Sequence, residues 1–474
     1  MKFKQQFHKL YAQLSPQAQS LLAYAYASIP MPLRKKRGFW GFLDFLRKSQ
    51  WESIQWHEDY QLAKLQALIA SAGKTSAYYR NLFKANGINT ADINSPADLK
   101  HIPILQKETL IHRLDEFIPE NFPRRRLMIN STSGSTGEPF KFYEDYYAVM
   151  REEAFAVRHW ENAGMKLGEP AIYLRSYVPN NQNATYRYDP VNNRHYLSAY
   201  HLDEQNLHFY CKKIEQIGSK FIFGYPSSLE VFADFLSMAG KTLKFSAVIT
   251  GSEMLTPNAR GKMERSFGAK VFDWYGLAEP TVTMGQCELG GYHLFSEYGY
   301  LELLNAQNNL ITTEGEIGRI VGTNFTNQAL PIIRYDTGDL GVHTNQKCNC
   351  GRGTPAVISA IHGRKDDLLV GANGQFLPSV NFYSMFAKLG GEVHRFQLIQ
   401  NGRSKFCLKL IRGPEFDQKS ISTIVEGLNQ RIGGRPEIEI EAVAKITPTR
   451  AGKIRAVIRN FSLSASPNGE EIEN

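Results

Sequence analysis

The middle of this 474-residue chain alternates short apolar runs with longer amphipathic stretches, and this alternation restricts the possible folds more than any other feature. Four runs suit buried strands, and four stretches have helical spacing. The predicted strands cover residues 171–174, 221–223, 247–249 and 271–274, and the predicted helices cover 146–163, 203–217, 227–239 and 257–267. Strands separated by helices predict an α/β domain with a largely parallel sheet, in which ligands bind at the carboxyl ends of strands.

The regions on either side of this middle differ from it, and the chain is too long for one ordinary core. Residues 1–100 are mostly helical, with one helix predicted over 49–72 and its C-cap at Gly73. Towards the other end, strands are predicted at 395–400, 405–411, 437–443 and 454–458, with a helix at 420–431. We therefore predict a helical part at 1–100, a core at 101–366, a small α+β domain at 367–460 and a flexible tail at 461–474.

A loop rich in hydroxyl groups precedes the first predicted helix of the core. Residues 132–137, TSGSTG, contain four hydroxyl side chains and two glycines between strand-like segments at 127–130 and 140–143. Glycine allows backbone N–H groups to face a ligand, and hydroxyls add donors, so the loop suits phosphate oxygens. It is not a Walker A loop, because no Gly-Lys-Ser/Thr closes it. A plain Ser/Gly-rich hairpin or linker is the alternative.

The formal charge of +9 suits an acidic ligand such as a nucleotide, and also a membrane surface or nucleic acid. We expect no nucleic-acid partner, because no recognisable nucleic-acid-binding motif accompanies the charge. A basic cluster at 34–37 precedes several aromatic residues and could contact an anionic membrane, but we favour a solvated cluster beside a packed helix. No apolar run reaches the roughly 18 residues that span a bilayer, and we see no signal peptide. Five cysteines form no disulfide framework, so we expect a cytoplasmic protein.

Four further segments follow the loop in a fixed order: DWYGLAE at 273–279, RYDTGD at 334–339, GRKDD at 363–367 and PTRAGKIR at 448–455. Together these segments resemble the adenylate-forming superfamily of acyl-CoA synthetases, peptide-synthetase adenylation domains and luciferases. Segments at 60–65, 78–80 and 102–107 are most similar to its phenylacetate–CoA ligase branch, which includes relatives in capsular polysaccharide clusters. The chain departs from the superfamily pattern at Ala278, where threonine is usual, and at Arg334, which lies one place early.

The resemblance implies a large adenylate-forming domain and a small mobile one. It also implies a ligase that activates a carboxylic acid with ATP and Mg²⁺ and then passes the acyl group to a thiol, with coenzyme A as the expected acceptor. Aromatic residues near the expected pocket, Phe223, Tyr225 and Trp274, suit an aromatic acid or are plain core. One rival is a ligase that transfers the acyl group to an amine or hydroxyl. Another is a non-catalytic nucleotide-binding scaffold.

Residue roles follow from the resemblance, position by position. Glu279 would bind Mg²⁺, and Asp339 would accept hydrogen bonds from the ribose hydroxyls, with Arg364 nearby. Lys453 would neutralise charge at the α-phosphate, and Asp366 would be the hinge of the small domain. The phosphate loop would comprise Thr132, Ser133, Gly134, Ser135, Thr136 and Gly137, with Thr136 also catalytic. The adenine would be framed by Gly251, Ser252, Glu253, Asp273, Trp274, Tyr275 and Gly276.

A second metal site is predicted outside these segments. Cys287 and His293 are six positions apart, and Cys348 and Cys350 lie in a tight turn. Three thiolates and an imidazole satisfy tetrahedral zinc, although the Cys-x-Cys spacing is tighter than in common zinc fingers. Small buried cysteines and a buried histidine are the alternative. Members of the resembling branch carry structural zinc at matching places, so we expect zinc here.

Overall fold

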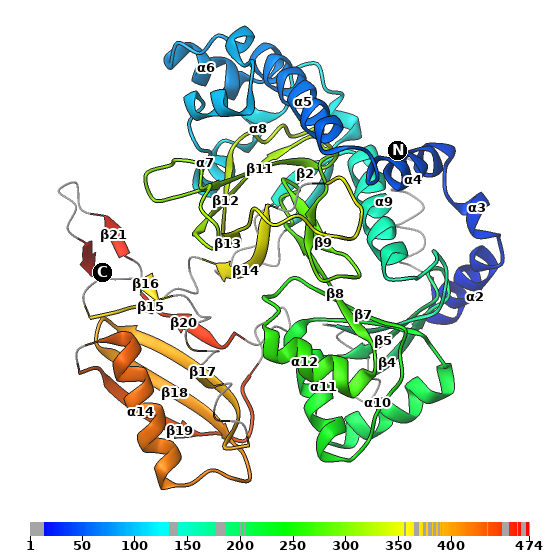
Figure 1. Cartoon of the computed structure of the whole chain (residues 1–474). Helices are drawn as coiled ribbons and strands as arrows, with labels where there is room; N and C mark the ends of the chain where they lie inside the picture. Colours follow the sequence, from blue (N-terminus) through cyan, green and yellow to red (C-terminus); the bar gives the residue numbers. More distant parts are fainter. Residues whose placement is uncertain are drawn as a thin grey trace.

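The computed structural model describes residues 14–131, 141–175, 185–199, 201–202, 204–354, 357–364, 369–372, 376–377, 382, 385–386, 389, 391–433, 435–447, 455–461, 463–465 and 471–473. Within these residues the fold is α/β, with a large N-terminal part built on two main sheets and a smaller α+β part at the C-terminal end (Figure 1). The predicted fold class is confirmed.

Helices dominate the first 130 residues. They are α2 (Pro16–Ala27), α3 (Met31–Arg34), α4 (Arg37–Ser49), α5 (Ile54–Thr75), α6 (Ala77–Ala85), α7 (Lys107–His112) and α8 (Leu114–Phe117), with 3₁₀ turns at Thr90–Asp92, Pro96–His101 and Arg124–Arg126. The predicted helix at 49–72 begins later, because the Ser53 side chain accepts a hydrogen bond from the Trp56 amide and caps α5.

The prediction of a C-cap at Gly73 was wrong. Gly73 lies inside α5, which continues to Thr75. A Cβ atom at this position would lie 2.9 Å from Cδ2 of Phe83 on α6. The glycine therefore permits close packing of α5 against α6. A local sequence pattern cannot predict this contact, because Phe83 lies on the next helix.

The largest sheet has eight strands in the order β10-β9-β8-β7-β6-β3-β5-β4. The predicted strands are β3 (Ala171–Arg175), β6 (Phe221–Gly224), β7 (Ala247–Gly251) and β8 (Lys270–Gly276), which pair in parallel. The strands not predicted lie at the edges: β4 (Tyr186–Asp189), β5 (Arg194–Ser198), β9 (Thr283–Gln286) and β10 (Tyr292–Leu294).

The predicted helices cover both faces of this sheet. Leucine and aromatic side chains of α10 (Glu204–Ile217), α11 (Pro226–Met238) and α12 (Pro257–Phe267) share one core with Ile172, Ile222 and Val248. On the other face, Trp160 of α9 (Tyr146–Asn162) packs against a core that contains Phe223 and Phe272. Burial of alternate strand residues on each side fixes the sheet between the helices.

An antiparallel sheet carries the second half of the expected site. Its strands are β11 (Gly299–Leu304), β12 (Ile317–Asn324), β13 (Tyr335–His343) and β14 (Ile358–Arg364), in chain order. A separate hairpin of β1 (Met128–Ser131) and β2 (Lys141–Glu144) flanks the hydroxyl-rich loop.

The C-terminal part has its own core. Strands β17 (Val393–Gly402), β18 (Lys405–Arg412), β19 (Glu437–Ala442) and β20 (Val457–Arg459) form a sheet in the order β19-β18-β17-β20. Helix α14 (Gln418–Ile432) buries Ile424 and Leu428 against it. Short pairs join β15 (Leu369–Val370) to β16 (Phe376–Leu377), and β21 (Leu463–Ala465) to β22 (Glu471–Glu473) within the predicted tail. The domain boundaries stay predictions.

Candidate active site

The expected adenine segment after β7 is held rigidly. Gly251 ends β7 beside Trp274 of β8, and a Cβ atom at Gly251 would lie 2.8 Å from the Trp274 carbonyl oxygen. Ser252 follows with a φ of 69°, a left-handed conformation that a non-glycine residue adopts only under constraint. The Glu253 carboxylate then accepts a hydrogen bond of 3.0 Å from the Ser227 amide in the first turn of α11. Close packing and a hydrogen bond thus fix this loop.

Asp273 does not offer its carboxylate to a ligand. Its side chain is buried and accepts hydrogen bonds from the Thr250 hydroxyl, at 2.5 Å, and from the Tyr292 hydroxyl. Burial raises the pKa of Asp273 above its ordinary value. The neighbouring Trp274 ring packs edge-on against Phe295, while Gly276 ends β8. Asp273 therefore ties β7, β8 and β10 together beneath the site.

Tyr275 links the two sheets through a carboxylate. Its hydroxyl donates a hydrogen bond of 2.8 Å to Oδ2 of Asp339 on β13, and both residues are buried. Asp339 lies opposite Arg364 in the β13–β14 register, although the Arg364 side chain is outside the described residues. The structure thus brings together three residues that the sequence places far apart.

Glu279 has two partners, one of which the sequence did not reveal. The Lys107 ammonium lies 3.3 Å from Oε1 of Glu279, and the Tyr335 hydroxyl lies 3.4 Å from the same oxygen. Glu279 is only 6% exposed, whereas the Lys107 side chain is 39% exposed. A buried carboxylate beside a partly exposed ammonium suits a cation site at which the lysine can yield its place.

Lys107 reaches Glu279 because its segment adds to the antiparallel sheet. The Leu105 amide donates to the Arg334 carbonyl at 2.8 Å, and the Asp336 amide donates to the Leu105 carbonyl at 2.9 Å. Arg334 itself is buried, with its guanidinium 2.8 and 2.9 Å from the two carboxylate oxygens of Glu302. The displaced arginine is therefore structural. Lys107 is the first residue of α7, and the resemblance of its segment at 102–107 implied no contact with Glu279.

The phosphate loop, residues 132–137, lies outside the described residues, but the hairpin that carries it is anchored near Glu279. The Asn327 side chain donates to the Tyr143 carbonyl of β2 at 2.8 Å, and the Asn327 amide donates to Oδ1 of Asn324 at 2.7 Å. The Asn324 side chain donates in turn to the Pro280 carbonyl, one residue after Glu279. Asn327 and Asn324 thus connect the hairpin to the backbone of the residue that follows Glu279.

Strand β17 of the C-terminal sheet contacts helix α11 of the large part. Arg395 of β17 lies 3.7 Å from the Glu230 carboxylate and donates a 3.5 Å hydrogen bond to the Ser227 carbonyl. Ser227 also contacts Glu253 of the expected adenine segment. Lys453 and Asp366 lie outside the described residues, so the structure does not test their roles. The contact at Arg395 brings the small part beside the same loop.

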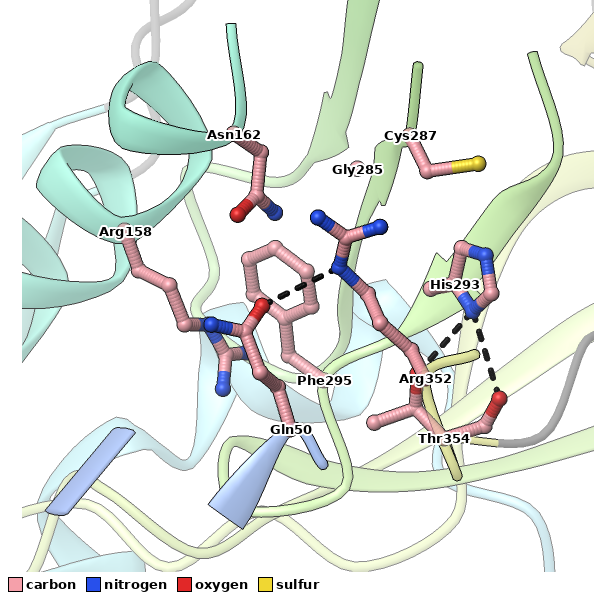
Figure 2. Close-up of a pocket in the computed structure, with 9 residues that line it drawn as sticks. All are labelled: Gln50, Arg158, Asn162, Gly285, Cys287, His293, Phe295, Arg352 and Thr354. Atoms are coloured by element: carbon pink, nitrogen blue, oxygen red, sulfur yellow. Dashed lines mark hydrogen bonds between the residues drawn. The ribbon is translucent and has the colours of Figure 1, made fainter. Parts of the chain in front are cut away.

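The four predicted zinc ligands converge. Sγ of Cys287 is 3.5 Å from Sγ of Cys348, Sγ of Cys350 is 3.3 Å from Nε2 of His293, and all four ligand atoms lie within 4.8 Å of one another. Tetrahedral zinc bonded at about 2.0 to 2.3 Å separates its ligand atoms by roughly 3.5 Å, so the cluster fits the ion. Nδ1 of His293 faces the Thr354 hydroxyl at 3.0 Å, which fixes the ring (Figure 2).

Without a cation, Cys348 is costly to bury as a thiolate. Burial raises the pKa of Cys348 to about 12. A divalent cation among the sulfurs would reverse that preference and hold them as thiolates. The ligands come from the β9–β10 hairpin and from the loop before β14, so an ion here would join the two sheets. The donor set is closed, which is typical of structural zinc.

A small polar cavity borders the cysteine cluster (Figure 2). Its two guanidinium groups are paired: Arg158 lies 2.9 Å from Glu297, and Arg352 lies 2.8 Å from Glu288. Arg352 also donates to the Gln50 side chain at 3.1 Å. Paired charges and near-complete burial of Arg158 indicate an internal network that joins α4, α9 and the cysteine loop.

Comparisons with known proteins agree with the motif resemblance. Residues 369–460 match the family model of the CapK C-terminal domain. The chain is 25% identical over 395 residues to protein CapK of Staphylococcus aureus, covering 82% of this chain and 86% of that protein. It is 24% identical over 340 residues to the phenylacetate–coenzyme A ligase of Thermus thermophilus, covering 65% of this chain and 71% of that one.

The fold also has solved counterparts. A 2-hydroxyisobutyryl-CoA ligase in its postadenylation state superimposes with a TM-score of 0.68 at 17% identity, covering 85% of this chain and 89% of that chain. The chain is thus a relative of CapK and of phenylacetate–CoA ligases with the fold of an adenylate-forming ligase, and the predicted resemblance is confirmed.

Proposed function

We propose that this relative of CapK and phenylacetate–CoA ligases is an ATP-dependent ligase that converts a carboxylic acid to its acyl-adenylate and transfers the acyl group to coenzyme A. One observation carries the proposal. Glu279 and Asp339, the expected Mg²⁺ and ribose ligands, are both held by tyrosine hydroxyls across the junction of β8 and β13. A single nucleotide can then be bound by its phosphates and its sugar at that junction.

The reaction joins two anions, a carboxylate and the α-phosphate, and expels pyrophosphate. Positive charge and fixed donors therefore supply most of the catalysis. Residues 132–137 would donate hydrogen bonds to the β- and γ-phosphates, and Glu279 would hold Mg²⁺, which neutralises phosphate charge when bound. Lys107, now beside Glu279, would exchange that contact for a phosphate oxygen. Lys453 would add an ammonium at the α-phosphate.

The small part would serve as a lid. In this proposal residues 367–460 form a domain that turns about Asp366 after adenylation, withdraws Lys453 and opens a path for the thiol. The match of residues 369–460 to a C-terminal domain family supports this division. Arg395 would leave Glu230 and Ser227 during the turn, because its contacts join the two parts.

One of the aromatic residues predicted near the acid pocket lies in the core. Phe223 stacks on Tyr173 with ring centroids 4.5 Å apart and is 2% exposed, so it belongs to the core rather than to a pocket wall. The suggestion of an aromatic acid therefore draws no support from this residue. The rival acceptors, an amine or a hydroxyl, fit the same adenylation site, since they differ only in the second half-reaction.

Pyrophosphate exchange over a panel of aryl, fatty and amino acids tests the proposal. An acid that drives exchange, followed by AMP release that depends on coenzyme A, is the expected result. AMP release with amines instead would establish the rival acceptor, and no exchange with any acid would favour a non-catalytic scaffold. Lys453→Ala should lower exchange by about 10²-fold or more while sparing turnover of a supplied acyl-adenylate.

We also propose structural zinc at Cys287, His293, Cys348 and Cys350, supported by the spacing of the four ligand atoms. Metal analysis of the purified protein tests this site. About one equivalent of zinc is expected, and less than about a tenth of an equivalent would exclude it.

A further inference from the structure

The first 43 residues have a one-sided charge pattern. They contain seven lysines and arginines, at positions 2, 4, 9 and 34–37, and no aspartate or glutamate. Between Lys9 and Arg34, 24 consecutive residues carry no charged side chain. This segment is therefore basic at both ends and uncharged between them.

The uncharged segment forms a helix that has no buried face. Ser15 caps α2 by accepting from the Ala18 amide, yet no residue of α2 whose exposure is described is buried. Leu21 is 72% exposed, Leu22 45% and Tyr24 54%, and Leu33 in α3 is 76% exposed. A short helix draws most of its stability from packing of an apolar side, so α2 has unused apolar surface.

The next helix behaves differently. Helix α4 buries Phe39, Leu43 and Leu46 in a core shared with α9, as expected for a helix beside a solvated basic cluster. By contrast, α2 touches the body through the Tyr24 ring, whose centroid is 6.3 Å from that of Tyr188 on β4. The apolar residues that follow the basic cluster are buried in the core, whereas the leucines of α2 and α3 that precede it are exposed.

The surface around α2 and α3 is well separated from the candidate lid. Both helices lie at one edge of the molecule beside β4 and β5, on the far side from β17–β20 (Figure 1). Contact through this edge would leave the C-terminal part unobstructed. No helix among the described residues is long and apolar enough to cross a bilayer, so any membrane contact by α2 would be in the plane of the surface.

We propose that α2 and α3 dock this protein in plane on an anionic phospholipid surface. Leucines would enter the acyl boundary, and Tyr24 and Tyr26 would lie at headgroup depth, where such rings concentrate. Lys36 and Arg37, both exposed, would face the anionic headgroups. Lys36 lies over the Tyr146 ring at 4.4 Å, an exposed contact that it can keep or release.

Charge favours lipid over a second copy of this chain as the occupant. An isologous contact through α2 and α3 would bring the basic cluster at 34–37 of one molecule near that of its partner, with no acidic residue among residues 1–43 to offset the charge. An anionic surface meets the same charges with the opposite sign. The neighbouring Lys35 is already paired with Glu153 and Arg34 with the Val191 carbonyl, so Lys36 and Arg37 carry the electrostatic part.

Sedimentation with vesicles tests the proposal on the full chain. We expect binding to phosphatidylcholine vesicles that contain phosphatidylglycerol and much weaker binding to phosphatidylcholine alone. A variant with Leu21→Ser and Leu22→Ser should lose binding by at least about tenfold, because those side chains are exposed and their replacement removes contacts with the acyl chains. Lys36→Gln with Arg37→Gln should weaken binding about fivefold for each charge removed, and added salt should do the same.

Matched control variants distinguish binding through α2 and α3 from non-specific binding of other exposed apolar or basic residues to vesicles. Met238→Ser with Leu289→Ser removes equally exposed apolar residues elsewhere, and Lys241→Gln with Lys244→Gln removes two exposed charges elsewhere. Both controls should bind like the parent. Equal binding by the α2 variant and the parent, or no binding to anionic vesicles, would overturn the proposal. Dimerisation without vesicles that the α2 variant abolishes would identify a second copy as the occupant instead.

Discussion

The Tyr275–Asp339 hydrogen bond gives the sharpest test of the nucleotide site. Tyr275→Phe removes a hydroxyl 2.8 Å from a carboxylate while keeping the ring that fills the core between the sheets. A hydrogen bond to a charged group contributes about 1.5–3 kcal/mol, and Asp339 keeps its other contacts, so we take the lower value. Because 1.4 kcal/mol is tenfold, the KM for ATP should rise about tenfold.

The assay compares ATP with 2′-deoxy-ATP in pyrophosphate exchange. In the parent, an Asp339 carboxylate held by Tyr275 should favour ATP, and in Tyr275→Phe that preference should shrink because the carboxylate is less well oriented. Tyr335→Phe is the matched control, since its hydroxyl lies 3.4 Å from Glu279 rather than near Asp339. An unchanged preference in Tyr275→Phe, or an equal change in both variants, would refute the assignment of Asp339 to the ribose.

Three further outcomes follow from other contacts. Lys107→Met should tighten Mg²⁺ binding to the nucleotide-free protein a few-fold in calorimetry, because the ammonium 3.3 Å from Glu279 competes with the cation; weaker binding would contradict this. Cys350→Ser should remove the zinc and lower the Tm by several degrees, whereas Cys211→Ala, in a separate core, should retain the metal. Burial raises the pKa of Glu152 in α9 to about 7, so the stability contributed by its neutral carboxyl group is complete below about pH 4.5 and is lost as the pH rises through 7. In denaturant titrations at different pH values, Glu152→Gln should flatten this dependence of the unfolding free energy, which amounts to up to about 3 kcal/mol. An unchanged pH profile would contradict the shift.

The sequence predicted the elements whose residues carry their own periodicity. Strands β3, β6, β7 and β8 are apolar on both faces, and helices α9 to α12 repeat apolar residues at helical spacing, so both types are visible in short windows. Edge strands such as β4 and β10 were missed because their pairing is set by neighbouring strands rather than by their own residue pattern. Gly73 was misjudged for a related reason: its role depends on Phe83 of the next helix, not on the end of its own.

The candidate site divides in the same way. The ordered segments and the resemblance they carry predicted roles for Glu279 and Asp339, and the Cys/His spacing outside those segments predicted the zinc ligands, because phosphate, ribose and metal each need such groups. No local pattern indicated the place of Lys107 beside Glu279, because that contact depends on Leu105 pairing with a strand far along the chain.

Residue order and side-chain chemistry therefore determined which groups are candidates for binding a nucleotide, an acid and a metal. Only the tertiary structure decided which of those groups are enclosed by other side chains and which lie where two sheets meet. Asp273 and Asp339 are the same side chain in similar strand contexts, yet one is enclosed by Thr250 and Tyr292 while the other meets Tyr275 at the junction of two sheets. Burial and hydrogen-bond partners come from distant strands, so no local pattern can distinguish the two carboxylates.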